Sequence, residues 1–229
     1  MHLSALIAYL QGLRENNNKA WFVMNKPAYD ILRAEFITLV SEVIATLSKS
    51  DPRIAGVDPK KAPFRIYRDI RFSHDKTPYK TRFSASIADG GVKHWGPMYF
   101  LQIDADGRLH LGAGCYLPPR DVLARLRAHV VAEHRGLGRV LKNKRFASTF
   151  GGLNQDDKLV RLPKGFDADM PDIDRIGDLL RLKSFIVTAD LDLTAAAHAK
   201  AARDLSQTIA STLSAAVPLN DWLRAASAA

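Results

Sequence analysis

Cysteine is almost absent from this chain, in which Cys115 is the only thiol among 229 residues. A single cysteine excludes an intramolecular disulfide and any zinc site built from several cysteines, and it fits a reducing compartment. The seven histidines lack the spacing of a metal site, and His129 and His134, five residues apart, do not share a helix face. We therefore expect no bound metal ion.

Long hydrophobic runs are also lacking, since no stretch approaches the roughly 20 apolar residues of a membrane span. The N-terminal segment has no basic region, and polar residues interrupt its apolar part early, so it does not resemble a secretory signal. A dinucleotide fingerprint is incomplete, because Gly112 and Gly114 supply only two of its three glycines. These absences predict a cytoplasmic protein with no cofactor and no membrane partner.

Positive charge is abundant and concentrated in one region. The chain carries a formal net charge of +9, and residues 60–82 hold eight Lys or Arg against two Asp. Such a cluster indicates an anionic partner, either a phosphorylated ligand or a nucleic acid.

The order of the expected elements indicates an α+β fold. Helical periodicity marks the segments 3–15, 27–50, 121–136, 138–149 and 193–216. Strand patterns mark the segments 63–72, 82–88, 98–104, 108–116 and 184–188. We predict a central antiparallel sheet of about five strands, with helices before and after it. Because no long linker divides the chain, residues 1–229 are expected to form a single domain.

Residues 64–72 alternate as a strand, which would place Phe64, Ile66, Arg68, Ile70 and Phe72 on one face. Arg68 is the anomaly in this pattern, because a buried guanidinium requires a carboxylate, a phosphate or several carbonyls. Either an internal acid or a ligand would meet that need. Removal of the Arg68 side chain would then cost on the order of 3 kcal/mol.

The turn that follows contains Pro78 and predicts a stiff corner, with Lys76 and Lys80 presented on either side of Tyr79. Two ammonium groups beside free backbone amides would suit a phosphate. The alternative is a tight hairpin in which the acids neutralise neighbouring arginines and the lysines face water.

Residues 64–81, FRIYRDIRFSHDKTPYKT, resemble the signature of a widespread, mostly bacterial family called domain of unknown function 2461. The likeness extends to four further segments: NNNKAWF (16–22), GAGCYLP (112–118), KGFD (164–167) and LRLKSF (180–185). The resemblance implies one compact α+β domain with a shared site near the signature. It implies no particular reaction, cofactor or catalytic residue.

Two other regions have both a functional and a structural interpretation. The carboxamides of residues 16–18, with Trp21 and Phe22, could form a pocket rim, but a helix-capping turn with an apolar anchor is favoured. A second basic region on residues 125–145 could extend an anion-binding surface, although such charges usually face solvent.

The favoured function is a binding module for an anionic ligand, phosphate-bearing or nucleic acid, at residues 65–82. The candidate ligand-binding residues are Arg65, Arg68, Arg71, Lys76, Lys80, Tyr79, Asp69 and Asp75. An enzyme with one of these two acids as base, and Tyr79 or Lys76 as acid, is the alternative. It ranks second because neighbouring arginines should lower the pKa of both carboxylates. A structural or protein-interaction role is a third interpretation.

Overall fold

The computed structural model describes residues 1–91, 95–195 and 198–228. Its sheet has the order β1-β2-β3-β4, and every neighbouring pair is antiparallel. The strands are β1 (Arg82–Ile87), β2 (Met98–Asp104), β3 (Arg108–Cys115) and β4 (Phe185–Asp192). The predicted α+β class is confirmed, with four strands in the sheet where about five were expected.

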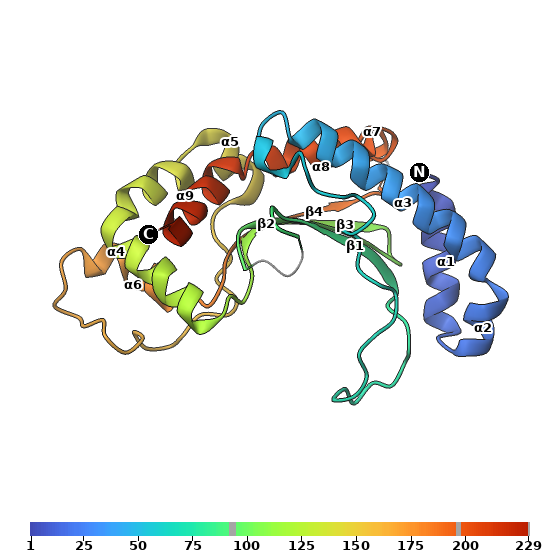
Figure 1. The fold of residues 1–229 in the computed structure, drawn as a ribbon, viewed down its shortest axis with the longest axis horizontal. Coiled ribbons are helices and arrows are strands. Elements are labelled where there is room, and N and C mark those ends of the chain that lie inside the picture. Colours follow the sequence, from blue (N-terminus) through green and yellow to red (C-terminus); the bar gives the residue numbers. More distant parts are fainter. Residues whose placement is uncertain (92–94, 196–197, 229) are drawn as a thin grey trace.

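Helices precede and follow the sheet along the chain (Figure 1). Those before it are α1 (Leu3–Glu15), α2 (Lys19–Met24), α3 (Lys26–Leu47) and the short 3-10 helix η1 (Pro52–Ile54). Between β3 and β4 lie α4 (Arg120–Leu141), α5 (Lys144–Phe150) and α6 (Ile173–Arg181). After β4 come α7 (Ala199–Arg203), α8 (Leu205–Ser214) and α9 (Val217–Ala228). None of these helices combines the length and apolar character needed to cross a bilayer.

Two helix boundaries differ from the sequence prediction. α4 continues through Gly136, where the sequence predicted its end, because that glycine lies against Trp222 of α9. The helix is nevertheless kinked just before this position, since Glu133 has non-helical backbone angles (φ −130°, ψ 26°). The predicted helix over 193–216 is divided into α7 and α8, and α9 was not predicted.

One face of the sheet is covered by helices, and the other is exposed only in part, since Ser84 and Ser86 of β1 are buried on that face. Tyr99, Leu101 and Ile103 of β2 are fully buried, whereas the alternate residues Phe100 and Gln102 are only half-buried. α3 and α8 cross above the covered face, while residues 64–81 extend below the other face (Figure 1). We call this second side, with Phe100 and Gln102, the open face.

A single hydrophobic cluster runs from Leu6 in α1 to Ala226 in α9. It includes residues from helices before and after the sheet along the chain and from all four strands. That residues 1–229 form one domain stays a prediction.

The predicted strand over 63–72 does not form. Only isolated bridges occur, between Pro63 and Ala85 and between Tyr67 and Tyr79. Ile66 is buried, but Phe64 is 43% exposed and Phe72 is 94% exposed, so of these three apolar residues only Ile66 lies in the core. Beyond Tyr67 the chain leaves the sheet and pairs with residues 78–79 of the same segment. The alternating side chains there therefore do not pack against the core.

A buried ion pair connects the start of η1 to the last helix. Asp51 is 2% exposed and accepts hydrogen bonds from Arg224 Nη2 at 2.5 Å and from the Tyr99 hydroxyl at 2.8 Å. The other guanidinium nitrogen of Arg224 donates to Asp221 at 3.1 Å. This network joins α9 to the sheet and to the segment after α3.

His110 on β3 lies between two carboxylates of neighbouring strands. Its Nε2 is 3.1 Å from Asp104 Oδ2 and its Nδ1 is 2.8 Å from Asp190 Oδ1. Partial burial opposes the imidazolium charge, but these two hydrogen bonds outweigh burial and raise the pKa of His110 above its ordinary value.

We expect this imidazolium to stabilise the protein at acidic pH. Because the folded pKa lies above the unfolded one, the contribution is complete below pH 6.5 and is lost as pH rises through the folded pKa. Relative to wild type, His110→Gln should therefore lower the melting temperature by about 2 °C at pH 5.5 and much less at pH 8.5. Thermal melts across this range check the prediction, and an equal effect at both values would contradict it.

Candidate functional site

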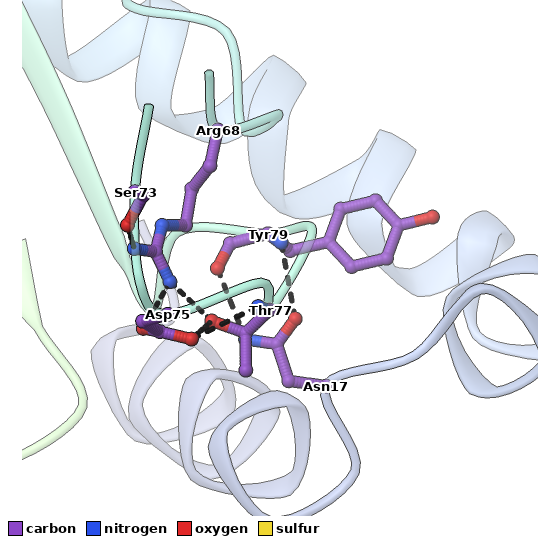
Figure 2. Close-up of polar contacts among 6 residues, drawn as sticks. All are labelled: Asn17, Arg68, Ser73, Asp75, Thr77 and Tyr79. Carbon is purple, nitrogen blue, oxygen red and sulfur yellow. Dashed lines mark hydrogen bonds and ion pairs between the residues drawn. The ribbon is translucent and has the colours of Figure 1, made fainter. Parts of the chain in front are cut away.

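The signature segment, residues 64–81, is closed by a turn that organises Arg68 (Figure 2). Asp75 Oδ1 accepts from the backbone N–H of Thr77 at 2.9 Å and from its hydroxyl at 2.8 Å. The Arg68 guanidinium donates to Asp75 Oδ2 and to the Thr77 hydroxyl oxygen, and it lies 3.4 Å from the Ser73 hydroxyl. At the predicted stiff corner, the Asp75 carboxylate thus binds both Thr77 of the turn and the Arg68 guanidinium.

Asn17 attaches this corner to the N-terminal helices (Figure 2). Its carboxamide donates to the Tyr79 carbonyl and accepts from the Tyr79 N–H, both at 3.0 Å. The Tyr79 ring stacks on Phe22 of α2, with centroids 4.2 Å apart. Two segments that carry the family resemblance, residues 16–22 and 64–81, therefore form one structural unit.

A cleft of about 540 Å³ opens beside this unit. Its lining comes from α1, the loop after it, the signature segment and the start of β1. The lining residues are Arg14, Asn17, Arg68, Asp69, Asp75, Thr77, Tyr79, Lys80, Thr81 and Arg82. Four of these carry positive charge and two carry negative charge, so the cleft has an excess of cations.

Internal acids neutralise only half of the four cations. Arg14 pairs with Asp106 at 2.8 Å, and Arg68 pairs with Asp75. Throughout the described part of the chain, no carboxylate lies within ion-pair distance of Lys80 or Arg82.

Burial and neighbouring cations both disfavour the charged form of Lys80. Burial, followed by the charges of Arg82 and Arg65, lowers its pKa below the ordinary value. Its ammonium donates only to the Arg65 carbonyl, at 3.0 Å. A bound anion would stabilise the charged lysine, so like-charge crowding here favours anion binding.

The two acids of the signature segment are unsuited to proton abstraction near neutral pH. Hydrogen bonds from the side chain and then the backbone of Arg71 lower the pKa of Asp69 to about 2. The Thr77 backbone N–H, followed by Arg68, lowers the pKa of Asp75 to about 2. Carboxylates that hold their charge this firmly are weak general bases.

Arg68 differs from its predicted environment. Its side chain has an internal carboxylate partner, as one alternative required, but that partner, Asp75, is 59% exposed and Arg68 itself is partly exposed. The expectation of a buried arginine on an apolar strand face is wrong, because the strand does not form. Loss of this pair should destabilise the protein less than loss of a buried pair would.

The other predicted site residues are dispersed. Arg65 is exposed outside the cleft lining, and Arg71 forms an ion pair with Asp69 at 2.7 Å. Lys76 donates to the Ile70 carbonyl at 3.0 Å, away from Lys80. The Tyr79 ring is 5% exposed in an aromatic cluster, so this residue borders the cleft mainly through its backbone.

Five lining residues are not among the predicted ligand-binding residues: Arg14, Asn17, Thr77, Thr81 and Arg82. Asn17 belongs to a segment considered as a pocket rim, but its pairing with Tyr79 had no sequence signal. Arg82 opens the strand on the face opposite Phe83, so strand alternation alone could have placed it beside the signature segment. Arg14 lies in the last turn of α1 and had no distinguishing pattern.

The capping interpretation of residues 16–18 is also correct in part. Asn18 caps α2 by accepting from the Trp21 N–H at 3.0 Å, and Asn16 donates to the Gly12 carbonyl. Cys115 is buried, and burial raises the pKa of its thiol to about 12, which disfavours a nucleophilic role.

The second basic region contains both structural and unpaired charges. Arg127 donates to the carbonyls of Leu180 and Leu182, and so satisfies acceptors at the end of α6. Arg145 likewise donates to Ser211 in α8. A groove of about 820 Å³ between α4 and α6 is lined by three further cations of this region, Arg135, Arg139 and Lys142.

Comparison with known proteins gives one match. The model of a family described as "Conserved hypothetical protein (DUF2461)" matches residues 5–222. No curated protein and no solved structure matches the chain. The matched range contains every residue that lines the cleft.

Proposed function

The chain belongs to the DUF2461 family of conserved hypothetical proteins, and we propose that it binds a phosphate-bearing ligand in the cleft beside Asn17. The observation that carries this proposal is the pair Lys80 and Arg82, two cations that line the cleft without a carboxylate partner among the described residues. Hydrogen bonds from ionised donors to phosphate oxygens are strong and directional.

Neighbouring groups support the same ligand chemistry. Arg68 and Arg14 add guanidinium hydrogen-bond donors to the cleft walls, and their aspartate partners hold them in place. The Asn17–Tyr79 pairing fixes the signature segment against α2, which preorganises the cleft before a ligand arrives. The acids in the wall favour binding over acid–base catalysis, because both are held in their charged form.

Inorganic polyphosphate is the simplest probe of this function. We expect wild type to bind it at low salt, with an affinity that falls as salt is raised. Replacing both Lys80 and Arg82 with alanine should weaken binding by about 10-fold or more, because two charged donors are lost. Isothermal titration calorimetry at two salt concentrations measures both effects.

The matched control is the double variant Arg135→Ala with Arg139→Ala, which removes the same charge from the groove beside α4. It should bind polyphosphate almost as tightly as wild type. The proposal fails if wild type does not bind polyphosphate, or if the control variant loses as much affinity as the cleft variant.

A further inference from the structure

Two aromatic side chains lie next to each other on the open face of the sheet. Phe64 and Phe100 have ring centroids 6.4 Å apart. Phe64 is 43% exposed and Phe100 is half-buried. Other aromatic side chains of the core are fully buried. Exposed rings at this spacing offer apolar surface that the protein itself does not cover.

The neighbours of Phe100 across the sheet are small. Ser86 of β1 and Gly112 of β3 are its register partners on the two sides. A Cβ at Gly112 would lie 3.7 Å from Phe100, in ordinary contact, so a larger side chain there would cover part of the ring. The sequence therefore leaves Phe100 accessible from the open face.

These rings adjoin the cationic cleft. The Lys80 ammonium lies 5.5 Å from the centroid of the Phe64 ring and also lines the cleft. Arg82 lines both the cleft and the small groove that contains Phe64. A ligand that places a phosphate on Lys80 and Arg82 would thus hold its next groups over the aromatic pair.

We propose that the ligand is a single-stranded nucleic acid, with its phosphates in the cleft and its bases on Phe64 and Phe100. This inference rests on the proposed function and adds the identity of the ligand. Aromatic platforms beside a cationic groove bind unpaired bases, because each base has a face that can stack. A duplex hides those faces, so it would lose the aromatic contribution.

Polar side chains on the open face fit base edges. Gln102 of β2 is half-buried next to the aromatic pair, and Thr188 of β4 is exposed in register with Gly112. Both can donate and accept hydrogen bonds.

An anionic lipid surface is the competing partner for a basic loop with exposed aromatic residues. Phe72, which is 94% exposed, lies in the middle of the signature segment. However, Arg71 beside it is paired with Asp69, and Lys76 donates to a backbone carbonyl. Lys80 and Arg82, which have no carboxylate partner among the described residues, both line the cleft beside the aromatic pair, and this favours the nucleic acid.

Binding should be measured by fluorescence anisotropy with a dye-labelled oligothymidine of about 12 nucleotides. We expect the single strand to bind more tightly than a duplex of the same length. Phe64→Leu and Phe100→Leu keep apolar volume but remove the stacking face, so each should weaken oligonucleotide binding by about 10-fold. Phe100→Leu, which lies away from Lys80 and Arg82 in the cleft lining, should leave the affinity for inorganic polyphosphate unchanged.

Phe72→Leu is the matched control, since it removes an exposed ring that lies outside the platform. Its oligonucleotide affinity should equal that of wild type. The inference is overturned, with the proposed function intact, if polyphosphate binds but the platform variants bind oligothymidine normally, or if polyphosphate binds and duplex and single strand bind equally. Binding to vesicles with about one-third anionic lipid that Phe72→Leu abolishes, without binding to oligothymidine, would overturn the inference in favour of a lipid surface. Absence of binding to both polyphosphate and oligothymidine would overturn the proposed function as well.

Discussion

Replacing Asp51 with alanine is expected to lower the free energy of unfolding by about 3–5 kcal/mol. Asp51 is almost completely buried and is the acceptor for both Arg224 and the Tyr99 hydroxyl. The variant would leave a guanidinium that is 14% exposed with one remaining acid partner, and a buried hydroxyl without its acceptor. Chemical denaturation monitored by tryptophan fluorescence measures this loss, because Trp222 lies in the same helix as Arg224.

Asp221→Ala is the appropriate comparison. It removes the second acid partner of Arg224, but Asp221 is largely exposed, so the loss should stay within about 1 kcal/mol. Equal losses for the two variants would show that the Asp51 network does not hold α9 in place.

Replacing Asn17 with alanine is expected to affect both stability and ligand binding. The variant removes two hydrogen bonds and leaves the partly buried N–H and C=O of Tyr79 without their partner, which should cost about 2 kcal/mol. Because the carboxamide also fixes one wall of the cleft, affinity for polyphosphate should fall by about 10-fold even at temperatures where the variant is fully folded.

Asn16→Ala gives a matched control from the adjacent position. Asn16 is exposed, and its side chain donates only to the Gly12 carbonyl at the end of α1. We expect a small loss of stability and unchanged polyphosphate affinity. If Asn17→Ala is destabilised but binds polyphosphate normally, the carboxamide has a structural role alone.

The secondary structure was predictable where the periodic apolar side chains pack into the core. The alternation of β2 and the helical spacing of α1 and α3 correspond to residues that are buried in the structure. The same rule failed for residues 63–72, because their alternation beyond Ile66 has no facing layer and the chain pairs with itself. Alternation predicts a strand only where another strand pairs with it, and the sequence does not show which segment that is.

The site was predictable in composition but not in arrangement. Two of the predicted cations, Arg68 and Lys80, line the cleft. Arg71 and Lys76 lie outside its lining, where an adjacent acid pairs with Arg71 and the Ile70 carbonyl accepts from Lys76. Contacts such as Asn17 with Tyr79 depend on residues 62 positions apart, which spacing alone cannot reveal.

A crystal structure grown with pyrophosphate tests the central claim most directly. The account predicts an anion in the cleft, with oxygens about 2.7–2.9 Å from the Lys80 ammonium and the Arg82 guanidinium. An empty cleft, with pyrophosphate bound instead at the groove of Arg135 and Arg139, would contradict it.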